Sequence, residues 1–172
     1  MKMTMYPDPI LLEECSLVES VPDPTIISDM ISIVNRVGGV GLAANQVGLS
    51  IGICVVNIPG PRGTKGPLVL VNPSYEFMDL DNMETSREHC LSLPFSGGVS
   101  VRRCLQIQVD YLDPQEMKHH SIVAEGFLAR VLQHEIDHLQ GITILQRTSK
   151  LQRNIAVKKM SKKLHKLGIN RK

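Results

Sequence analysis

Two histidines four residues apart, with a glutamate directly after the first, are the residues in this sequence best spaced to do chemistry. They lie in QHEIDHLQG (133–141), as His134, Glu135 and His138. On a helix this spacing puts both imidazoles on one face as metal ligands, with a carboxylate beside them as a base. A catalytic zinc-type site needs three protein ligands and an open position for water. The motif therefore predicts a metal-dependent hydrolase if a third ligand exists; otherwise the two histidines cover the edge of a core.

The third ligand has to come from elsewhere in the chain. Downstream of the motif only His165 is available, within a basic tail that contains no Asp or Glu. Upstream, Cys90 in REHCLSLP (87–94) falls between two expected strands. Cys15 and Cys54 lie in apolar segments typical of buried thiols, and Cys104 is expected to open a strand. Context favours Cys90, although composition alone leaves the choice open.

The elements that must position these residues follow from hydrophobic periodicity. Helical spacing predicts helices over 25–37 and over about 127–140, and β-rich or alternating runs predict strands at 51–58, 68–77 and 105–113. The buried face of the second helix is expected to consist of Phe127, Leu128, Val131, Leu132 and Leu139. Strands come first and no regular βαβ alternation follows. This order predicts an α+β fold of mostly antiparallel sheets packed around the helix that carries HExxH.

The overall composition indicates one compact domain. The chain has 172 residues, of which 42% are hydrophobic. We expect a catalytic domain over 1–148 and a basic amphipathic helix over 149–172 that extends the same domain. No run approaches the roughly 18 to 20 apolar residues that span a bilayer, and the first residues lack the apolar segment of a signal peptide. Four unevenly spaced cysteines are typical of reduced thiols, so a cytoplasmic location is expected.

Basic residues are concentrated in the tail. Residues 147–172 contain ten Lys or Arg and no Asp or Glu, whereas residues 1–146 contain nine basic and 17 acidic side chains, a net charge of −8. Helical spacing links Leu151, Ile155, Met160, Leu164 and Leu167, with Gly168 as the expected end of the helix. The basic face of this helix is either solvated or a docking surface for RNA or another anionic partner.

Three blocks of sequence, in order, carry a resemblance to a known family. GVGLAANQVG (39–48), EHCLSLP (88–94) and QHEIDHLQG (133–141) resemble the three signature motifs of peptide deformylase. YPDP (6–9) and VNP (71–73) also match, so the likeness extends to about residue 148. The resemblance implies that Cys90, His134 and His138 hold a metal ion. It also implies removal of the N-formyl group from the N-terminal methionine of new polypeptides during translation, with release of formate.

The resemblance implies roles for further residues. Glu135 takes a proton from water activated at the metal and passes it to the leaving amine. The side-chain amide of Gln46 and the backbone N–H of Leu91 stabilise the developing oxyanion. The glycines of the first block either make a tight turn or, as we favour, let substrate backbone approach closely. The residues expected to contact substrate are Val40, Gly41, His89 and Val131.

The metal and the partners are implied in the same way. The family points to Fe²⁺ in the cell, with Zn²⁺, Ni²⁺ or Co²⁺ possible in purified protein, whereas one thiolate and two imidazoles would equally suit zinc. The substrates are nascent formyl-Met polypeptides. Members of the family act on chains that emerge from the ribosome, so the basic tail is expected to dock on ribosomal RNA. A membrane partner is less favoured because the tail lacks Trp and Phe anchors.

One residue departs clearly from the family pattern. His89 stands where the family usually has Gly, in EGCLS. A positive φ at this position would cost about 1 kcal/mol or more, whereas an extended backbone would cost little. The alternative function is therefore a deformylase-like amidase with altered substrate or weakened activity. A third possibility is a non-enzymatic RNA-binding protein with an incidental HExxH. The segment LPFSGGVSVRR also differs from the family pattern, so it is open whether Arg102 or Arg103 acts near the substrate. Asp137 either hydrogen-bonds a group that supports the site or forms a surface salt bridge.

Overall fold

The computed structural model describes residues 1–58, 66–93 and 97–166. Its helices are α1 (Pro24–Val37), α2 (Gly126–Leu139), α3 (Ile144–Arg147) and α4 (Lys150–Lys166), with 3-10 turns η1 (Pro9–Leu11) and η2 (Ala44–Val47). Its strands are β1 (Gly41–Ala43), β2 (Ile53–Val56), β3 (Leu68–Phe77), β4 (Met83–Glu88), β5 (Val99–Cys104), β6 (Gln106–Leu112) and β7 (His119–Glu125). The predicted helices and strands are thus present, while β1, β4, β5, β7 and α3 were not predicted. Cys104 ends a strand and does not open one.

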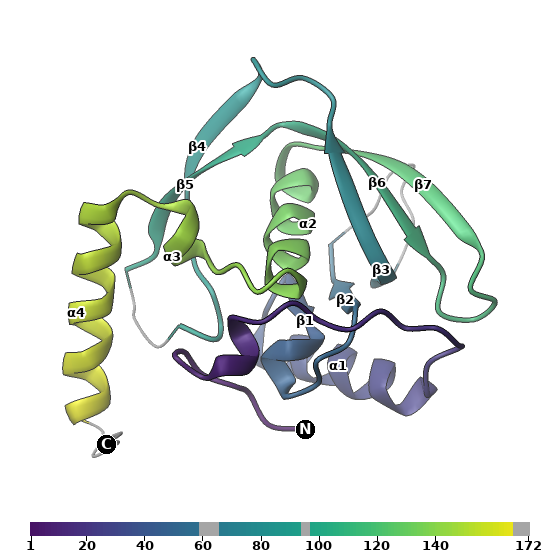
Figure 1. Ribbon diagram of the computed structural model, residues 1–172, viewed down its shortest axis with the longest axis horizontal. Coiled ribbons are helices and arrows are strands. Elements are labelled where there is room, and N and C mark those ends of the chain that lie inside the picture. Colours follow the sequence, from purple (N-terminus) through teal and green to yellow (C-terminus); the bar gives the residue numbers. More distant parts are fainter. Residues whose placement is uncertain (59–65, 94–96, 167–172) are drawn as a thin grey trace.

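The strands form two antiparallel sheets around one helix. Five strands pair in the order β1-β2-β3-β6-β7, and β4 pairs with β5 in a separate hairpin. In Figure 1, α2 stands at the centre, with the large sheet on one side and β4, β5, α3 and α4 on the other. This arrangement confirms the predicted α+β fold with a central HExxH helix.

The central position of α2 follows from its apolar side chains. Leu132 and Ile136 are fully buried in a core that includes Leu70 and Ile107 from the large sheet. Phe127, which was predicted to be buried, is 60% exposed, so that prediction is wrong. It lies in the first turn of α2 and lines the pocket described below, which leaves its ring open to solvent.

A second core holds the segment before β1 in place. Asp23 caps α1 by accepting hydrogen bonds from Thr25, and Gly38 ends the helix in a left-handed conformation. Met30, Ile33 and Val34 of α1 then pack on apolar residues of β1 and β2. The glycine-rich stretch that follows α1 is thereby fixed beside α2.

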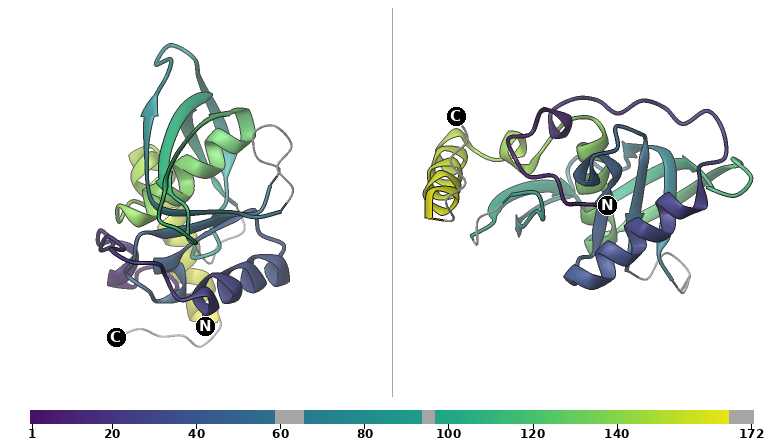
Figure 2. Two further views of the ribbon diagram at one scale, coloured as in Figure 1. Left: turned by 90° about the vertical axis from the view of Figure 1, so that its right-hand side faces the viewer. Right: turned by 90° about the horizontal axis from the view of Figure 1, so that it is seen from below.

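The C-terminal helix docks through Ala156 and Met160, of which only Met160 belongs to the predicted apolar stripe. Ala156 and Met160 are buried in a cluster with Val99 and Val101 of β5, whereas Leu151 and Ile155 are 70% and 47% exposed. The small side chain of Ala156 lets α4 approach the β4–β5 hairpin closely. This two-stranded hairpin is too narrow to cover the whole apolar stripe predicted for α4. Figure 2 shows α4 at one end of the molecule. The side chains of Leu164 and Leu167 and the predicted stop at Gly168 lie outside the described part. No helix in that part is long and apolar enough to cross a membrane.

Candidate metal centre and substrate pocket

One thiol and two imidazoles converge between α2 and the segment after β4. The potential ligand atoms of Cys90, His134 and His138 lie within 4.8 Å of one another, the single such cluster of three among the described residues. Cys90 Sγ is 3.1 Å from His138 Nε2. The two histidines lie one helical turn apart, with ring centroids separated by 5.0 Å. The structure therefore brings the three predicted ligands together, although Cys90 lies 44 residues before His134 and 48 before His138 in the sequence.

The surroundings of this cluster suit a divalent transition metal. Burial, followed by the charges of His134 and Arg103, holds the pKa of His138 well below its usual range, so this imidazole is neutral in the metal-free protein. Burial alone would lower the pKa of His134, but hydrogen bonds with Cys90 and Glu88 outweigh it and raise the pKa well above its usual range, so a metal ion bound there would displace its proton. Glu135 Oε2 is buried without a hydrogen-bond partner among the described residues. Burial raises the pKa of Glu135 to about 7, against the lowering effect of His134. A buried carboxylate without a partner is costly, and a cation with bound water would supply one.

His134 is oriented by a carboxylate that the sequence reasoning did not identify. Its Nδ1 lies 3.0 Å from Glu88 Oε2, which leaves Nε2 to face Cys90 and His138. Burial alone would raise the pKa of Glu88, but hydrogen bonds from His134 and Arg103 outweigh it and lower the pKa to about 2. Glu88 is therefore a carboxylate at neutral pH. The only hint in the sequence was its place in EHCLSLP.

Two arginines bond Glu88, and one of them, Arg103, links it to a second carboxylate, Asp137. Arg103 donates to Glu88 over 3.0 and 3.1 Å and also pairs with Asp137, while Arg130 donates to Glu88 over 2.9 Å. Asp137 is 1% exposed and also accepts from Arg147. The open question about Asp137 is thus answered in favour of a buried network over a surface salt bridge. Arg103 belongs to this network, and Arg102 lies on the exposed side of β5.

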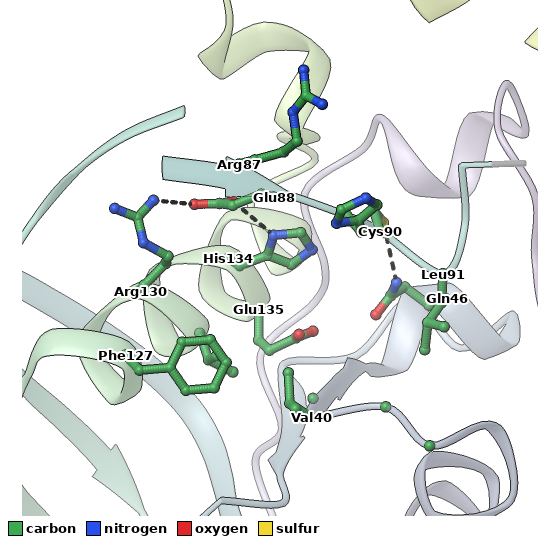
Figure 3. A pocket seen from close by; sticks show the side chains of 15 residues that line it. Val40, Gln46, Arg87, Glu88, Cys90, Leu91, Phe127, Arg130, His134 and Glu135 are labelled. Atoms are coloured by element: carbon green, nitrogen blue, oxygen red, sulfur yellow. Dashed lines mark hydrogen bonds and ion pairs between the residues drawn. The ribbon is translucent and has the colours of Figure 1, made fainter. Parts of the chain in front are cut away.

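A pocket opens in front of the cluster. It is lined by Gly38, Gly39, Val40, Gly41, Gln46, Arg87, Glu88, His89, Cys90, Leu91, Phe127, Arg130, Val131, His134 and Glu135. Figure 3 shows Glu135 pointing into the space between Val40 and His134, with Phe127 on the same side of the pocket as Arg130. Every residue predicted to contact substrate, and both residues predicted to stabilise an oxyanion, lie in this lining. Their roles stay predictions.

Gly41 allows the backbone to approach the predicted base. A Cβ at this position would lie 2.4 Å from Glu135 Oε1, which is inside van der Waals contact. Any side chain here would therefore displace Glu135. The missing side chain of Gly41 thus makes room for Glu135, whereas close approach of substrate backbone to this glycine stays a prediction.

Gln46 is held with its amide N–H groups directed toward the candidate metal centre. Its Oε1 accepts a 2.8 Å hydrogen bond from Ala43 N–H, and its Nε2 donates to Ser92 Oγ over 3.2 Å and faces Cys90 Sγ at 3.6 Å. The neighbouring Asn45 donates to the backbone carbonyl of His138 and so ties η2 to α2. Since the carbonyl of Gln46 accepts from Ala43, its amide nitrogen, which now donates to Ser92 and faces Cys90, is the end that would donate to a substrate oxygen.

His89 is accommodated without backbone strain. Among the described residues other than glycine, only Asn72 and Met117 have positive φ, so His89 does not carry the cost considered above. Its side chain is exposed and reaches Gly98, where an added Cβ would lie 3.0 Å from His89 Cε1 and 2.6 Å from the Glu88 carbonyl oxygen. The glycine at 98 thus leaves room for the imidazole at 89.

A thiol, two imidazoles, a buried carboxylate and an amide donor around one pocket define the class of metal-dependent amide hydrolases. Comparisons identify the family. The family model described as polypeptide deformylase matches residues 1–154. The chain is 38% identical over 151 residues to the peptide deformylase of Desulforudis audaxviator, covering 86% of this chain and 93% of the relative. It is 40% identical over 167 residues to that of Orientia tsutsugamushi, covering 91% of each.

Solved structures agree with this assignment. The peptide deformylase of Ehrlichia chaffeensis superposes with a TM-score of 0.85 at 33% identity, covering 96% of this chain and 97% of the other. That of Legionella pneumophila gives a TM-score of 0.84 at 33% identity, covering 99% and 98%. The chain belongs to the peptide deformylase family, whose members remove the N-formyl group from nascent polypeptides. It is accordingly an enzyme of a metal-dependent family, and the interpretation as a non-enzymatic RNA-binding protein is wrong.

Proposed function

We propose that Cys90, His134 and His138 hold the catalytic metal ion of this deformylase and that Glu135 is its general acid and base. The observation that carries this proposal is the cluster of three ligand atoms within 4.8 Å beside a buried carboxylate oxygen without a partner. When bound, a divalent cation supplies Lewis acidity, which polarises the formyl group and acidifies water.

Side chains and backbone of the protein then transfer the proton and stabilise the oxyanion. Glu135 lies close to the cluster and is buried, so it accepts a proton from water and delivers it to the leaving amine of methionine. The amide nitrogen of Gln46 and the backbone N–H of Leu91 donate hydrogen bonds to the oxyanion that develops on the formyl oxygen. The hydrogen bond from Ala43 N–H holds Gln46 in place before substrate arrives, which reduces the reorganisation that the reaction requires.

The pocket suits a formyl-methionyl peptide. Val40 and Gly41 lie along one side of the pocket, and His89 lies on the segment that carries Cys90. Val131, on α2, presents an apolar surface for the methionine side chain, and the exposed ring of Phe127 extends this surface. Because His89 is unstrained, the structure offers no reason for weakened catalysis; His89 is proposed to influence only the residues that follow methionine.

We propose Fe²⁺ as the metal in the cell and Zn²⁺, Ni²⁺ or Co²⁺ as ions that the purified protein also accepts. A thiolate with two neutral imidazoles is a donor set that suits each of these ions. Geometry alone does not separate iron from zinc, so the choice of iron depends on the resemblance to the family.

We further propose that residues 1–148 form the catalytic domain and that residues 149–172 extend it. We also propose that the protein acts in the cytoplasm, where the exposed basic face of α4 docks on the ribosome. Lys158, Lys159, Lys162 and Lys163 are all exposed. Replacing Lys158 and Lys159 by Glu is expected to reduce cosedimentation with ribosomes and to leave hydrolysis of a short formyl peptide unchanged. Unchanged cosedimentation would refute the docking proposal.

The catalytic proposal is tested by formate release from formyl-Met-Ala-Ser. The full chain is purified without oxygen, loaded with Fe²⁺, and compared with Glu135→Ala after the metal content of both has been measured. We expect wild type to release formate and Glu135→Ala to retain metal but to be about 100- to 10,000-fold slower. Protein that carries one equivalent of metal and releases no formate would refute the assignment of these residues.

A further inference from the structure

A continuous series of buried ion pairs connects His134 to the start of the C-terminal helix. His134 Nδ1 bonds Glu88 over 3.0 Å, and Glu88 accepts two hydrogen bonds from Arg103, of 3.0 and 3.1 Å. Arg103 pairs through Nη1 with Asp137. Asp137 in turn accepts from Arg147 over 3.0 and 2.5 Å. We call these five residues the ion-pair chain.

The ion-pair chain is buried except at its far end. The side chains of Glu88, Arg103 and Asp137 are 5%, 3% and 2% exposed, whereas that of Arg147 is 37% exposed. Water cannot replace a lost partner at the buried positions, so removal of one member leaves a charge without compensation. Arg147 is the member that can be changed without opening the core.

The geometry of Arg103 makes its two carboxylate partners interdependent. One edge of its planar guanidinium, formed by Nε and Nη2, meets both oxygens of Glu88, and Nη1 meets Asp137. The position of Asp137 therefore restricts the plane of the guanidinium, and that plane restricts Glu88. Since Glu88 accepts from His134, the orientation of this imidazole depends on where Asp137 is held.

Docking of α4 fixes the arginine that holds Asp137. Arg147 is the last residue of α3, and the next residue, Thr148, donates from Oγ1 to the carbonyl of Ser100 on β5 over 2.9 Å. Ser100 N–H donates to Gln152 of α4 over 2.8 Å. The cluster that buries Ala156 of α4 also packs against Cys90. The helix is thus anchored on β5, the strand that carries Arg103, by hydrogen bonds at Ser100 and by apolar contacts with Val99 and Val101.

We propose that Arg147 is a positioning residue for His134: with α4 docked, it holds Asp137 and, through Arg103 and Glu88, sets the orientation in which His134 binds the metal ion. The inference rests on the metal ligation proposed above. It makes the junction of α3 and α4, which touches neither substrate nor metal, part of the support of the metal centre. A change that weakens the contacts at this junction is expected to increase the rate at which the metal ion dissociates.

The test measures metal retention rather than activity alone. The full chain is loaded with Zn²⁺, and release of Zn²⁺ to an excess of chelator is followed for wild type, Arg147→Met, Arg147→Lys and Arg36→Met. Arg36 is the matched control because it is an exposed arginine in the last turn of another helix, α1. We expect release from Arg147→Met to be about tenfold faster than from wild type, at the lower end of effects of residues that support metal ligands.

Two further readouts separate positioning from general stability. Arg147→Lys keeps one charge but cannot bind both oxygens of Asp137, so its release rate is expected to fall between wild type and Arg147→Met. With Co²⁺ in place of Zn²⁺, the visible absorption bands of Arg147→Met are expected to shift, because they report ligand geometry, while those of Arg36→Met remain as in wild type.

The outcomes distinguish this inference from the proposal beneath it. Equal Zn²⁺ release and equal Co²⁺ spectra for Arg147→Met and Arg36→Met would overturn the positioning role. The same conclusion holds if Arg147→Met lowers only the melting temperature of the metal-free protein. Wild-type protein that binds no stoichiometric Zn²⁺ or Co²⁺ would overturn the metal ligation itself, and this inference with it. If Arg147→Met does not fold, an unchanged release rate for Arg147→Lys would refute the inference.

Discussion

Replacement of Glu135 by Gln is expected to stabilise the metal-free protein at alkaline pH. Glu135 is 4% exposed, and burial raises its pKa from an ordinary value of 4.5 to about 7. Below pH 4.5 the carboxyl group is protonated in both the folded and the unfolded chain. Between 4.5 and 7 the unfolded chain loses this proton while the folded chain keeps it, so the free energy of unfolding falls as the pH rises. Above pH 7 this loss is complete.

The size of the effect follows from the two pKa values. The interval from 4.5 to about 7, at about 1.36 kcal/mol for each pH unit, corresponds to about 3 kcal/mol. Gln has nearly the same shape and does not ionise. Relative to wild type, Glu135→Gln should therefore gain about 3 kcal/mol of unfolding free energy between pH 4.5 and pH 8. A bound cation favours the carboxylate, so the gain should shrink in metal-loaded protein.

The assay is urea denaturation of metal-free protein, followed by circular dichroism at several pH values in the presence of a chelator. Glu19→Gln is the control, since Glu19 is exposed and far from the cluster in sequence. The reasoning would be refuted by an unfolding free-energy difference between Glu135→Gln and wild type that does not change between pH 4.5 and pH 8. The same substitution should abolish rapid formate release. Glu135 would then be a residue that the proposed reaction needs but that lowers the stability of the metal-free protein above pH 4.5.

Four further expectations can be tested alongside. Gly41→Ala should lower kcat on formyl-Met-Ala-Ser about 100-fold, because a Cβ 2.4 Å from Glu135 Oε1 displaces the base; an unchanged kcat would contradict the close-approach argument. Cys90→Ser should abolish tight Zn²⁺ binding, measured by chelator competition, and equal affinity would remove Cys90 from the ligand set. His89→Gly should leave the melting temperature and the rate on formyl-Met-Ala-Ser within about twofold of wild type, because His89 is unstrained. Ala156→Glu should place a charge in a site that is 2% exposed and release α4, seen as new proteolytic cleavage within Lys150–Lys166, and an unchanged cleavage pattern would refute the docking described for this helix.

Periodicity was sufficient to locate the elements whose side chains alternate between core and solvent. The helices at 24–37 and 126–139 and the strand at 106–112 agree closely with the predicted ranges, because burial on one face imposes a local pattern that a short window records. The strands β4 and β5 carry many polar residues, two of which, Glu88 and Arg103, belong to the ion-pair chain, so no such pattern marked them. The tail shows the opposite error: Leu151 and Ile155 have helical spacing but face away from β5.

The sequence by itself determined the chemistry of the site. The pair of histidines with Glu135 indicated a metal centre, and three ordered motifs indicated the family. Both inferences depend only on residue types and their spacing in the sequence. Only the tertiary structure decided which carboxylate orients His134, why Asp137 and Arg103 are buried, and how the C-terminal helix contacts the rest of the chain. The hydrogen bonds of Glu88 with His134 and Arg103, and that of Arg103 with Asp137, join residues that are 15 to 46 positions apart. No local pattern encodes such pairs, because their ion pairs form only after α2 and the β4–β5 hairpin have packed together.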